Sequence, residues 1–323
     1  MIRLALVFAA LAIFPVVMQA ADGLFYVGLA TRMLIYAIAA TSLNLALGYG
    51  GMVSFGHAAF FGAGAYTVGI LAAEGVSSVW LAWPAAIAVA ALAAWLIGAV
   101  SLRTRGVYFI MITLAFAQMV YYLFVSLKSY GGEDGLPVRG RSDPGFGLSL
   151  SGDLAWYYVV LALLALLLYG LWRLSRSRFG RAIAAIRENE ARAEAVGFPV
   201  YRLQLACFVL SGAAAGLAGA LIANQSGYVS PSLLHWIQSG TLMIMVILGG
   251  VGRLWGGAIG ALVLLGLEHL IADYQFGWLE RLAPSYQDHA GLAVGVVLLA
   301  IVLAAPQGLA GLVSGNKRGK KGA

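Results

Sequence analysis

The sequence predicts an all-α polytopic membrane protein with about ten transmembrane or re-entrant helices. Of its 323 residues, 62% are hydrophobic and only 10% are charged, whereas a soluble globular domain carries roughly 25% charged residues. Apolar segments also recur along the chain, and many approach the ~20 residues that a helix needs to cross ~30 Å of hydrocarbon. A soluble fold with so little charge could not solvate its surface, which excludes that class.

The apolar segments define ten candidate spans in sequence order. They are residues 4–20, 25–47, 52–73, 80–100, 107–127, 154–174, 203–223, 241–250, 256–270 and 292–305. Several are short or interrupted by glycine. We expect residues 1–323 to form a single transmembrane domain, with a long cytoplasmic loop at about 173–203 and a basic cytoplasmic tail at about 314–323.

The first segment has an alternative interpretation. Arg3, a short apolar stretch and small residues at Ala20 and Ala21 also resemble a cleavable signal peptide. We favour a retained helix because ten spans with Arg3 inside complete the charge pattern described next. N-terminal sequencing of the purified protein distinguishes the two.

Positive charge segregates to one side of the ten-span topology, as it does in cytoplasmic loops. Fifteen of the 20 Lys and Arg residues fall there: Arg3, Arg103, Arg105, Arg173, Arg176, Arg178, Arg181, Arg187, Arg192, Arg202, Arg253, Lys317, Arg318, Lys320 and Lys321. Both termini are therefore expected in the cytoplasm, and the net charge of +7 reflects membrane topology rather than nucleic-acid binding. The longest outer loop, 128–153, is either a landing surface for an external partner or a solvated connector.

Signatures of catalysis are missing from the sequence. There is no metal-spaced His/Cys cluster, and Cys207 is the single cysteine. No GxxxxGK[ST] motif occurs, so this chain cannot cradle ATP phosphates by itself. We expect a transport subunit without a cofactor, and not an enzyme. A stand-alone secondary transporter or channel stays open as an alternative.

The longest inner loop, RLSRSRFGRAIAAIRENEARAEAVGFPVYRL, predicts two short helices on the cytoplasmic face. Phe179, Ala182, Ile183 and Ile186 recur at i, i+3, i+4 and i+7, the period of one helix face. Asn189 can cap the second helix, and a glycine eight residues later can end it. The stripe is mostly Ala and Ile, which favours docking of a cytoplasmic protein over an interfacial helix lying on lipid.

Small residues predict the tight helix contacts, because helices in lipid associate by close packing. Two runs follow a spacing of three or four residues: Ala58, Gly62, Ala65 and Gly69 in the third span, and Gly212, Gly216, Gly219 and Ala223 in the seventh. A third glycine cluster, residues 249–260, joins two short apolar segments.

The glycines at 48–51 and 249–257 also predict breaks between membrane helices, and broken helices in both halves point to a transport pathway. A third helix starting near residues 52–54 could turn its positive N-terminal end to an anionic group. The candidate pathway residues are Asn44, Ser54, His57, Tyr66 and Gln118. Each could instead bridge two helices, and for His57 a packing role is favoured over a proton relay.

Four separated stretches resemble the LivM-type permeases of branched-chain amino acid ABC importers. They are SLNLALGYGGMVSFGHAAFFGAGAY (42–66), RTRGVYFIMITLAFAQ (103–118), SRFGRAIAAIRENEARAEAVG (177–197) and LGGVGRLWGGAIGA (248–261). The resemblance implies a subunit of the bacterial inner membrane. Its partners would be a second homologous permease, two cytoplasmic ATPase subunits that bind the ATP, and a periplasmic substrate-binding protein.

The resemblance also implies that the inner loop couples to the ATPases. The residues assigned to that role are Ile183, Ile186, Arg187, Glu190, Ala191, Glu194 and Gly197. A permease for urea or short-chain amides in the same superfamily remains an alternative, because no residue in this sequence decides the substrate.

Overall fold

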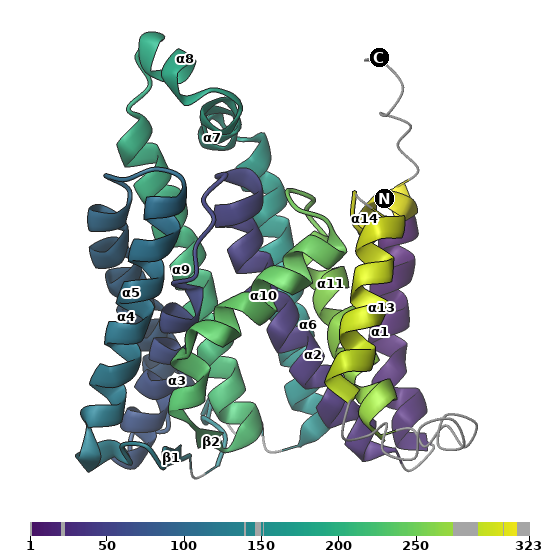
Figure 1. The fold of residues 1–323 in the computed structure, drawn as a ribbon. Helices are drawn as coiled ribbons and strands as arrows, with labels where there is room; N and C mark the ends of the chain where they lie inside the picture. Colours follow the sequence, from purple (N-terminus) through teal and green to yellow (C-terminus); the bar gives the residue numbers. More distant parts are fainter. Residues whose placement is uncertain are drawn as a thin grey trace.

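The computed structural model describes residues 2–20, 23–138, 140–145, 150, 152–273, 290–305 and 307–314, and within these ranges the chain is nearly all helical (Figure 1). The apolar helices are α1 (Ile2–Ala20), α2 (Leu24–Asn44), α3 (His57–Ala73), α4 (Val79–Ser101), α5 (Val107–Ser126), α6 (Asp153–Arg176), α9 (Val200–Ser226), α10 (Trp236–Gly249), α11 (Gly256–Asp273) and α13 (Ala290–Ala304). Three shorter helices are α7 (Arg178–Glu188), α8 (Glu190–Ala195) and α14 (Leu309–Ser314). The strands β1 (Leu136–Pro137) and β2 (Tyr228–Val229) pair antiparallel.

In the described residues, six helical stretches are long and apolar enough to cross a membrane. They are Leu24–Tyr49, Val79–Ser101, Val107–Ser126, Asp153–Arg176, Val200–Ser226 and Gly291–Gly311. Four shorter apolar helices accompany them: Ala10–Gln19, His57–Ala73, Trp236–Gly249 and Gly256–Ile271. The predicted all-α polytopic fold is confirmed, and each predicted span corresponds to one of these helices.

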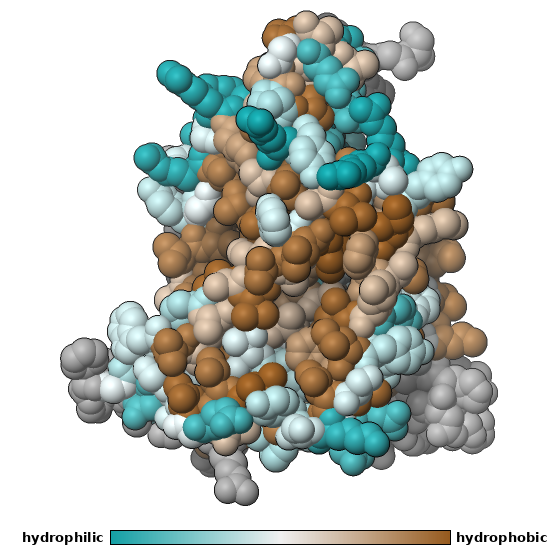
Figure 2. All heavy atoms as spheres, turned by 90° about the vertical axis from the view of Figure 1, so that its left-hand side faces the viewer, coloured by the Kyte–Doolittle hydropathy of each residue, from teal (hydrophilic) through white to brown (hydrophobic). Residues whose placement is uncertain are grey.

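The outer surface of α4 and α5 is a broad apolar belt between two polar ends (Figure 2). Exposed side chains along these two helices include Trp80, Leu92, Trp95, Val107, Tyr108, Met111, Met119 and Tyr122. The indole of Trp80 donates to the Pro144 carbonyl at 2.9 Å while 69% of the residue stays exposed. Aromatic side chains with one polar atom favour the boundary between lipid and water, so this belt is a lipid-facing surface.

Helix α1 is hydrogen-bonded to α6 next to its proline, which leaves a backbone carbonyl without its usual intrahelical donor. Pro15 has no N–H, so it cannot bond to the carbonyl of Leu11 four residues earlier. The Tyr157 hydroxyl donates to that carbonyl at 2.7 Å, and Tyr158 donates to the Ala12 carbonyl at 2.9 Å. These bonds favour a retained first helix, which stays a prediction.

The centre of the bundle is the contact of α3 with α9, where backbone meets backbone. A Cβ on Gly64 would lie 2.7 Å from Gly216 Cα, and a Cβ on Gly219 would lie 2.9 Å from Ala65 N. The other predicted small residues of α3 face elsewhere: Gly62 lies against Leu234, and Gly69 lies against the β1–β2 ribbon. Helix α3 therefore packs against α9 on one side and against a short 3₁₀ helix, Pro231–Leu234, and the β1–β2 ribbon on another.

The start of α3 differs from the prediction. The predicted third span begins at residue 52, but residues 51–56 are not helical and α3 begins at His57. The apolar composition of Met52, Val53 and Phe55 continues through this segment, so hydropathy alone extends the helix too far. Glycines on both sides of the segment favour an irregular backbone.

The two ends of the bundle carry different elements (Figure 1). One end, the coupling end, holds α7, α8, α14 and the beginning of α1. The opposite end, the ribbon end, holds β1 and β2. This matches the predicted grouping of the inner loop with the first segment on one side of the membrane.

Gly219 tests the close packing of α3 and α9. We expect Gly219→Ala to lower the stability of the purified protein by about 1–3 kcal/mol, because the added methyl group meets the backbone at Ala65. Thermal unfolding in detergent measures the loss. The matched control is Gly170→Ala on α6, where nothing lies within 4 Å of an added Cβ. Equal melting temperatures for the two variants would contradict the packing argument.

Candidate functional site

Two interruptions of the helical backbone meet near the coupling end. Helix α2 ends in a π-helical turn, Leu45–Tyr49, and the second interruption is the turn between α10 and α11. Asn44 joins them, because its Nδ2 donates to the Arg253 carbonyl at 2.7 Å and its Oδ1 accepts from Gly252 N at 2.9 Å. The residue is 1% exposed. Its amide therefore satisfies one donor and one acceptor of the second break and holds both breaks together.

The first amides of α3 have partners within the chain. Ser54 Oγ accepts from Gly56 N at 3.0 Å, and Ser239 Oγ of α10 accepts from Ala58 N at 2.8 Å. The Ser239 hydroxyl in turn donates to the Phe55 carbonyl at 2.7 Å. The expected helix start near residues 52–54 is wrong, because α3 begins at His57 and the amides of Gly56 and Ala58 are bonded within the chain. These amides are already used to fasten α3 to α10.

His57 lies fully buried where α2, α3 and α9 meet. Its Nε2 is 2.7 Å from Ser211 Oγ, and the Ser211 hydroxyl donates to the Ser42 carbonyl. Because the serine proton is already used, Nε2 carries the proton of the His57–Ser211 bond. The ring also packs edge-on against Phe60 and Phe208. This is the geometry of a residue that links three helices.

Tyr66 and Gln118 differ from Asn44 and Ser54 among the predicted pathway residues. The Tyr66 hydroxyl and the Gln118 Oε1 are buried and have no hydrogen-bond partner among the described residues. The Tyr66 ring packs on Phe124 of α5 with 4.5 Å between centroids. Buried polar atoms without partners are costly, so these two atoms and His57 Nδ1, which also lacks a partner, are the predicted pathway groups that stay free to bind something else.

A large hollow opens at the ribbon end, and we call it the vestibule. It encloses about 700 Å³ between the first half of α2, the start of α6, the end of α9 and the chain after β2. Its lining is Leu24, Phe25, Gly28, Leu29, Arg32, Tyr36, Arg141, Asp153, Ile222, Gln225, Ser226, Tyr228, Ser230, Ser232 and Leu233. An apolar wall thus faces a small set of charged and polar groups, the composition of a small-molecule site.

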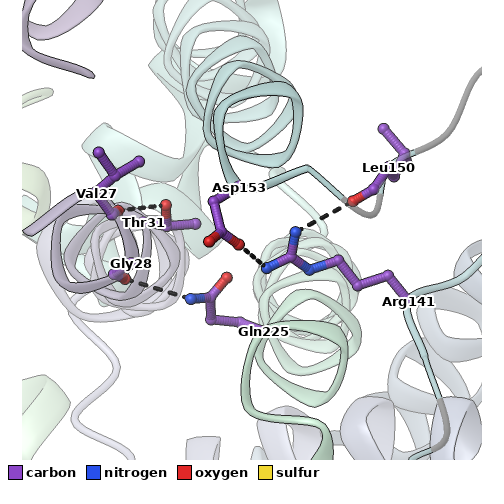
Figure 3. Close-up of polar contacts among 7 residues, drawn as sticks. All are labelled: Val27, Gly28, Thr31, Arg141, Leu150, Asp153 and Gln225. Atoms are coloured by element: carbon purple, nitrogen blue, oxygen red, sulfur yellow. Dashed lines mark hydrogen bonds and ion pairs between the residues drawn. The ribbon is translucent and has the colours of Figure 1, made fainter. Parts of the chain in front are cut away.

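The polar wall of the vestibule is an ordered arrangement (Figure 3). Arg141 Nη2 pairs with Asp153 Oδ1 at 2.5 Å, and its Nη1 donates to the Leu150 carbonyl at 3.2 Å. Gln225 Nε2 donates to the Gly28 carbonyl at 3.3 Å. These bonds join α9 to α2, and the outer loop to the start of α6, around the hollow.

Arg32 supplies positive charge to the same hollow. Its guanidinium lies 5.8 Å from the Tyr36 ring centroid. Glu268 of α11 lies within electrostatic range, but among the described residues Arg32 forms no salt bridge. An exposed guanidinium at this place is available to an anionic group.

Sequence reasoning missed Arg141, Asp153 and Gln225. Arg141 and Asp153 belong to an outer loop, and Gln225 lies just beyond the predicted seventh span. Gln225 and Ser226 at the end of an apolar run were the one local signal. No group of three His, Cys, Asp or Glu that could hold a metal ion occurs in the part of the chain that the structure describes.

The predicted coupling loop folds as the hairpin α7–α8. Asn189 Oδ1 caps α8 by accepting from Arg192 N at 2.9 Å, and Gly197 follows the helix with φ +90°. Left-handed backbone of this kind suits glycine. The predictions of a cap at Asn189 and a stop at Gly197 are confirmed. Arg105 from the α4–α5 turn pairs with Glu190 at 3.2 Å and with Glu194 at 3.6 Å.

The apolar stripe of α7 faces this chain and not the surrounding solution. Ile183 and Ile186 are 2% and 3% exposed and pack in a cluster with Leu45, Leu171 and Phe208. This differs from the prediction, which gave the stripe to a partner. Burying Ile against the bundle is favourable because it removes apolar surface from water. The surface left for a partner is the exposed side of the hairpin, which includes Ala191 and Val196.

An apolar belt, interrupted helices bound to one another and a hollow with charged groups at one end are the features of a multi-pass membrane permease. Residues 25–305 match the family described as branched-chain amino acid transport system / permease component. The chain belongs to this family.

Two kinds of relative within the family are similar to the chain. The high-affinity branched-chain amino acid transport system permease protein LivM of Escherichia coli K12 is 29% identical over 321 residues, covering 92% of this chain and 72% of the relative. LivM of Salmonella typhimurium LT2 is 30% identical over 307 residues, 88% of this chain and 69% of the relative. The high-affinity branched-chain amino acid transport system permease protein LivH of E. coli K12 is 28% identical over 296 residues, which cover 85% of this chain and 91% of the relative. No solved structure matches significantly. The LivM-type resemblance is confirmed.

Asn44 provides a test of the joined breaks. We expect Asn44→Ala to destabilise the purified protein by about 1–3 kcal/mol, because it leaves Gly252 N and the Arg253 carbonyl without their partner. Thermal unfolding in detergent measures the effect. The control is Thr241→Val on α10, whose hydroxyl bonds to the Ile237 carbonyl of its own helix. Unchanged stability of Asn44→Ala would show that the amide does not hold the breaks.

Proposed function

We propose that the chain is the transmembrane permease subunit of an ATP-driven ABC importer for branched-chain amino acids. The observation that carries this proposal is the match to LivM over most of both chains. Similarity to LivH as well supports pairing with a second, homologous permease. The two permeases then work by alternating access, opening a shared pathway first to one side of the membrane and then to the other.

The energy for transport comes from partner subunits in this proposal. The sequence has no phosphate-binding GxxxxGK[ST] motif, so two cytoplasmic ATPase subunits bind the ATP. They dock on the exposed side of the α7–α8 hairpin, where Ala191, Glu194 and Val196 are exposed. Small and mixed-charge side chains allow close approach of another protein surface.

The coupling end faces the cytoplasm and the ribbon end faces the periplasm of a bacterial inner membrane. Support comes from the Arg residues of α7 and α8 and the α4–α5 turn, which gather at the coupling end. A periplasmic substrate-binding protein then delivers its amino acid at the ribbon end, where the vestibule opens.

The vestibule suits the two halves of an apolar amino acid. Leu29, Ile222 and Leu233 offer an apolar wall to the side chain. Arg32 suits the α-carboxylate, while the charge of Asp153 is already paired with Arg141. We therefore assign the vestibule as the entrance that receives the substrate from the binding protein.

Reconstitution tests the function. The complex of the chain with its partner permease, ATPases and binding protein is placed in liposomes, and uptake of labelled leucine, urea and acetamide is measured with and without ATP. ATP-dependent leucine uptake that requires the binding protein is expected. Uptake by this chain alone would support a stand-alone transporter or channel, and a preference for urea or acetamide would support the amide alternative.

Arg32 tests the entrance. We expect Arg32→Met to raise the KM for leucine about tenfold, because a hydrogen-bonded charge pair contributes about 1.5–3 kcal/mol and 1.4 kcal/mol is tenfold. The KM of Arg32→Lys should lie between those of Arg32→Met and the wild type, since the charge remains but the bidentate geometry is lost. Arg103→Met, in the exposed α4–α5 turn, is the control. Wild-type KM in Arg32→Met would remove Arg32 from the substrate path.

A further inference from the structure

Arg187, at the end of α7, touches both glycine breaks. Its Nη1 donates to the Gly48 carbonyl in the π-helical turn. Its Cγ would lie 3.1 Å from a Cβ on Gly51, and its Nη1 would lie 2.8 Å from a Cβ on Gly252. One side chain from the hairpin therefore contacts the end of α2, the segment after it and the α10–α11 turn.

The Gly48 carbonyl is open to this donor because of how α2 ends. The amides after the turn bond to other carbonyls: Gly50 N to Leu45, Gly51 N to Leu47 and Met52 N to Ala46. Gly48 O is thus left for a side chain. A guanidinium at the C-terminal end of a helix is also favourable, since the helix dipole places negative partial charge there.

This arrangement requires glycine at positions 48 and 252. A Cβ on Gly48 would meet Asn44 Oδ1 and would lie 2.7 Å from Gly252 Cα. Gly252 itself has φ +74°, a conformation that side chains rarely adopt. The glycines therefore let two breaks, Asn44 and the guanidinium share one small space. We call this group, Asn44, Gly48, Arg187 and Gly252, the clasp.

Other residues of α7 pack against the π-helical turn and so hold Arg187 in place. Phe179 and Ile183 lie with Leu45 and Tyr49 of the π-helical turn around one small gap, and Ile186 is buried in the same cluster as Leu45. Helix α7 thus packs on the π-helical turn through apolar contacts, while the Arg187 side chain extends beyond that turn to Gly252. The α10–α11 turn is itself bonded to the segment before α14, because Arg253 Nη2 donates to Gln307 Oε1 at 3.1 Å.

We propose that Arg187 is a positioning residue that transmits movement of the α7–α8 hairpin to both interrupted helices at once. The proposal rests on the proposed function, in which ATPases move this hairpin. When the hairpin shifts, the guanidinium carries the end of α2 with it, and Asn44 carries the α10–α11 turn. The two breaks then move together and not independently.

The experiment uses the whole reconstituted complex with Arg187→Met, which keeps the aliphatic stem and removes the donors. We expect assembly and ATP hydrolysis to stay within about twofold of wild type, while leucine taken up per ATP hydrolysed falls about tenfold. Arg187→Lys, which can reach one carbonyl but cannot span both breaks, is expected to be intermediate. The matched control is Arg173→Met, an exposed arginine near the end of α6 that contacts neither break.

A second readout follows the α10–α11 turn directly. Val251→Cys places a thiol on that turn, where Val251 is 39% exposed, while the native Cys207 is fully buried. In the complex with native Arg187, maleimide labelling at position 251 should differ between the nucleotide-free and ATP-trapped states. In Arg187→Met this difference should disappear, which loss of packing alone would not produce.

The possible outcomes distinguish failure of the Arg187 proposal from failure of the proposed function. Arg187→Met that assembles and keeps both wild-type coupling and the labelling difference overturns the proposal. If Arg187→Met does not assemble, Arg187→Lys carries the same two measurements, and wild-type values for it overturn the proposal. Failure of the unsubstituted complex to import leucine is a failure of the proposed function. Import of another solute changes the substrate and leaves the comparison between variants intact.

Discussion

A backbone interrupted inside a membrane must find a partner for every N–H and C=O that the helix no longer binds, because lipid offers none. The rest of this fold depends on how that requirement is met. Asn44 supplies a donor and an acceptor to the α10–α11 turn, and Arg187 supplies a donor to the end of α2. Side chains from elsewhere in the fold thus replace the missing helical bonds and join the interrupted segments.

Helix α2 connects the two regions of functional interest. Arg32 faces the vestibule at one end and Asn44 belongs to the clasp at the other. Twelve residues separate them, which is about 18 Å along a helix at 1.5 Å per residue. A continuous helix therefore links the coupling end to the vestibule over that distance. The glycine contacts of α3 with α9 bring these two helices close together.

Local signals predicted a large part of this structure. The apolar segments located the apolar helices of the described residues because hydropathy reports burial in lipid or protein directly. The cap at Asn189 and the stop at Gly197 were also predictable, since both depend on residues within one turn. The start of α3 was not, because residues 52–55 are as apolar as the helix that follows. Packing around Ser54 and Ser239 decides where that helix begins.

By itself the sequence determined the class of protein, the order of the apolar helices in the described residues, the breaks at the glycines and the family. These follow from composition, spacing and short motifs, all of which are local. Only the tertiary structure decided that Ile183 and Ile186 face inward, that Arg141, Asp153 and Gln225 surround one hollow, and that Arg187 reaches Gly48 across 139 positions of the chain. Those relations depend on which helix faces pack together, and residue spacing within one helix carries no information about its neighbours.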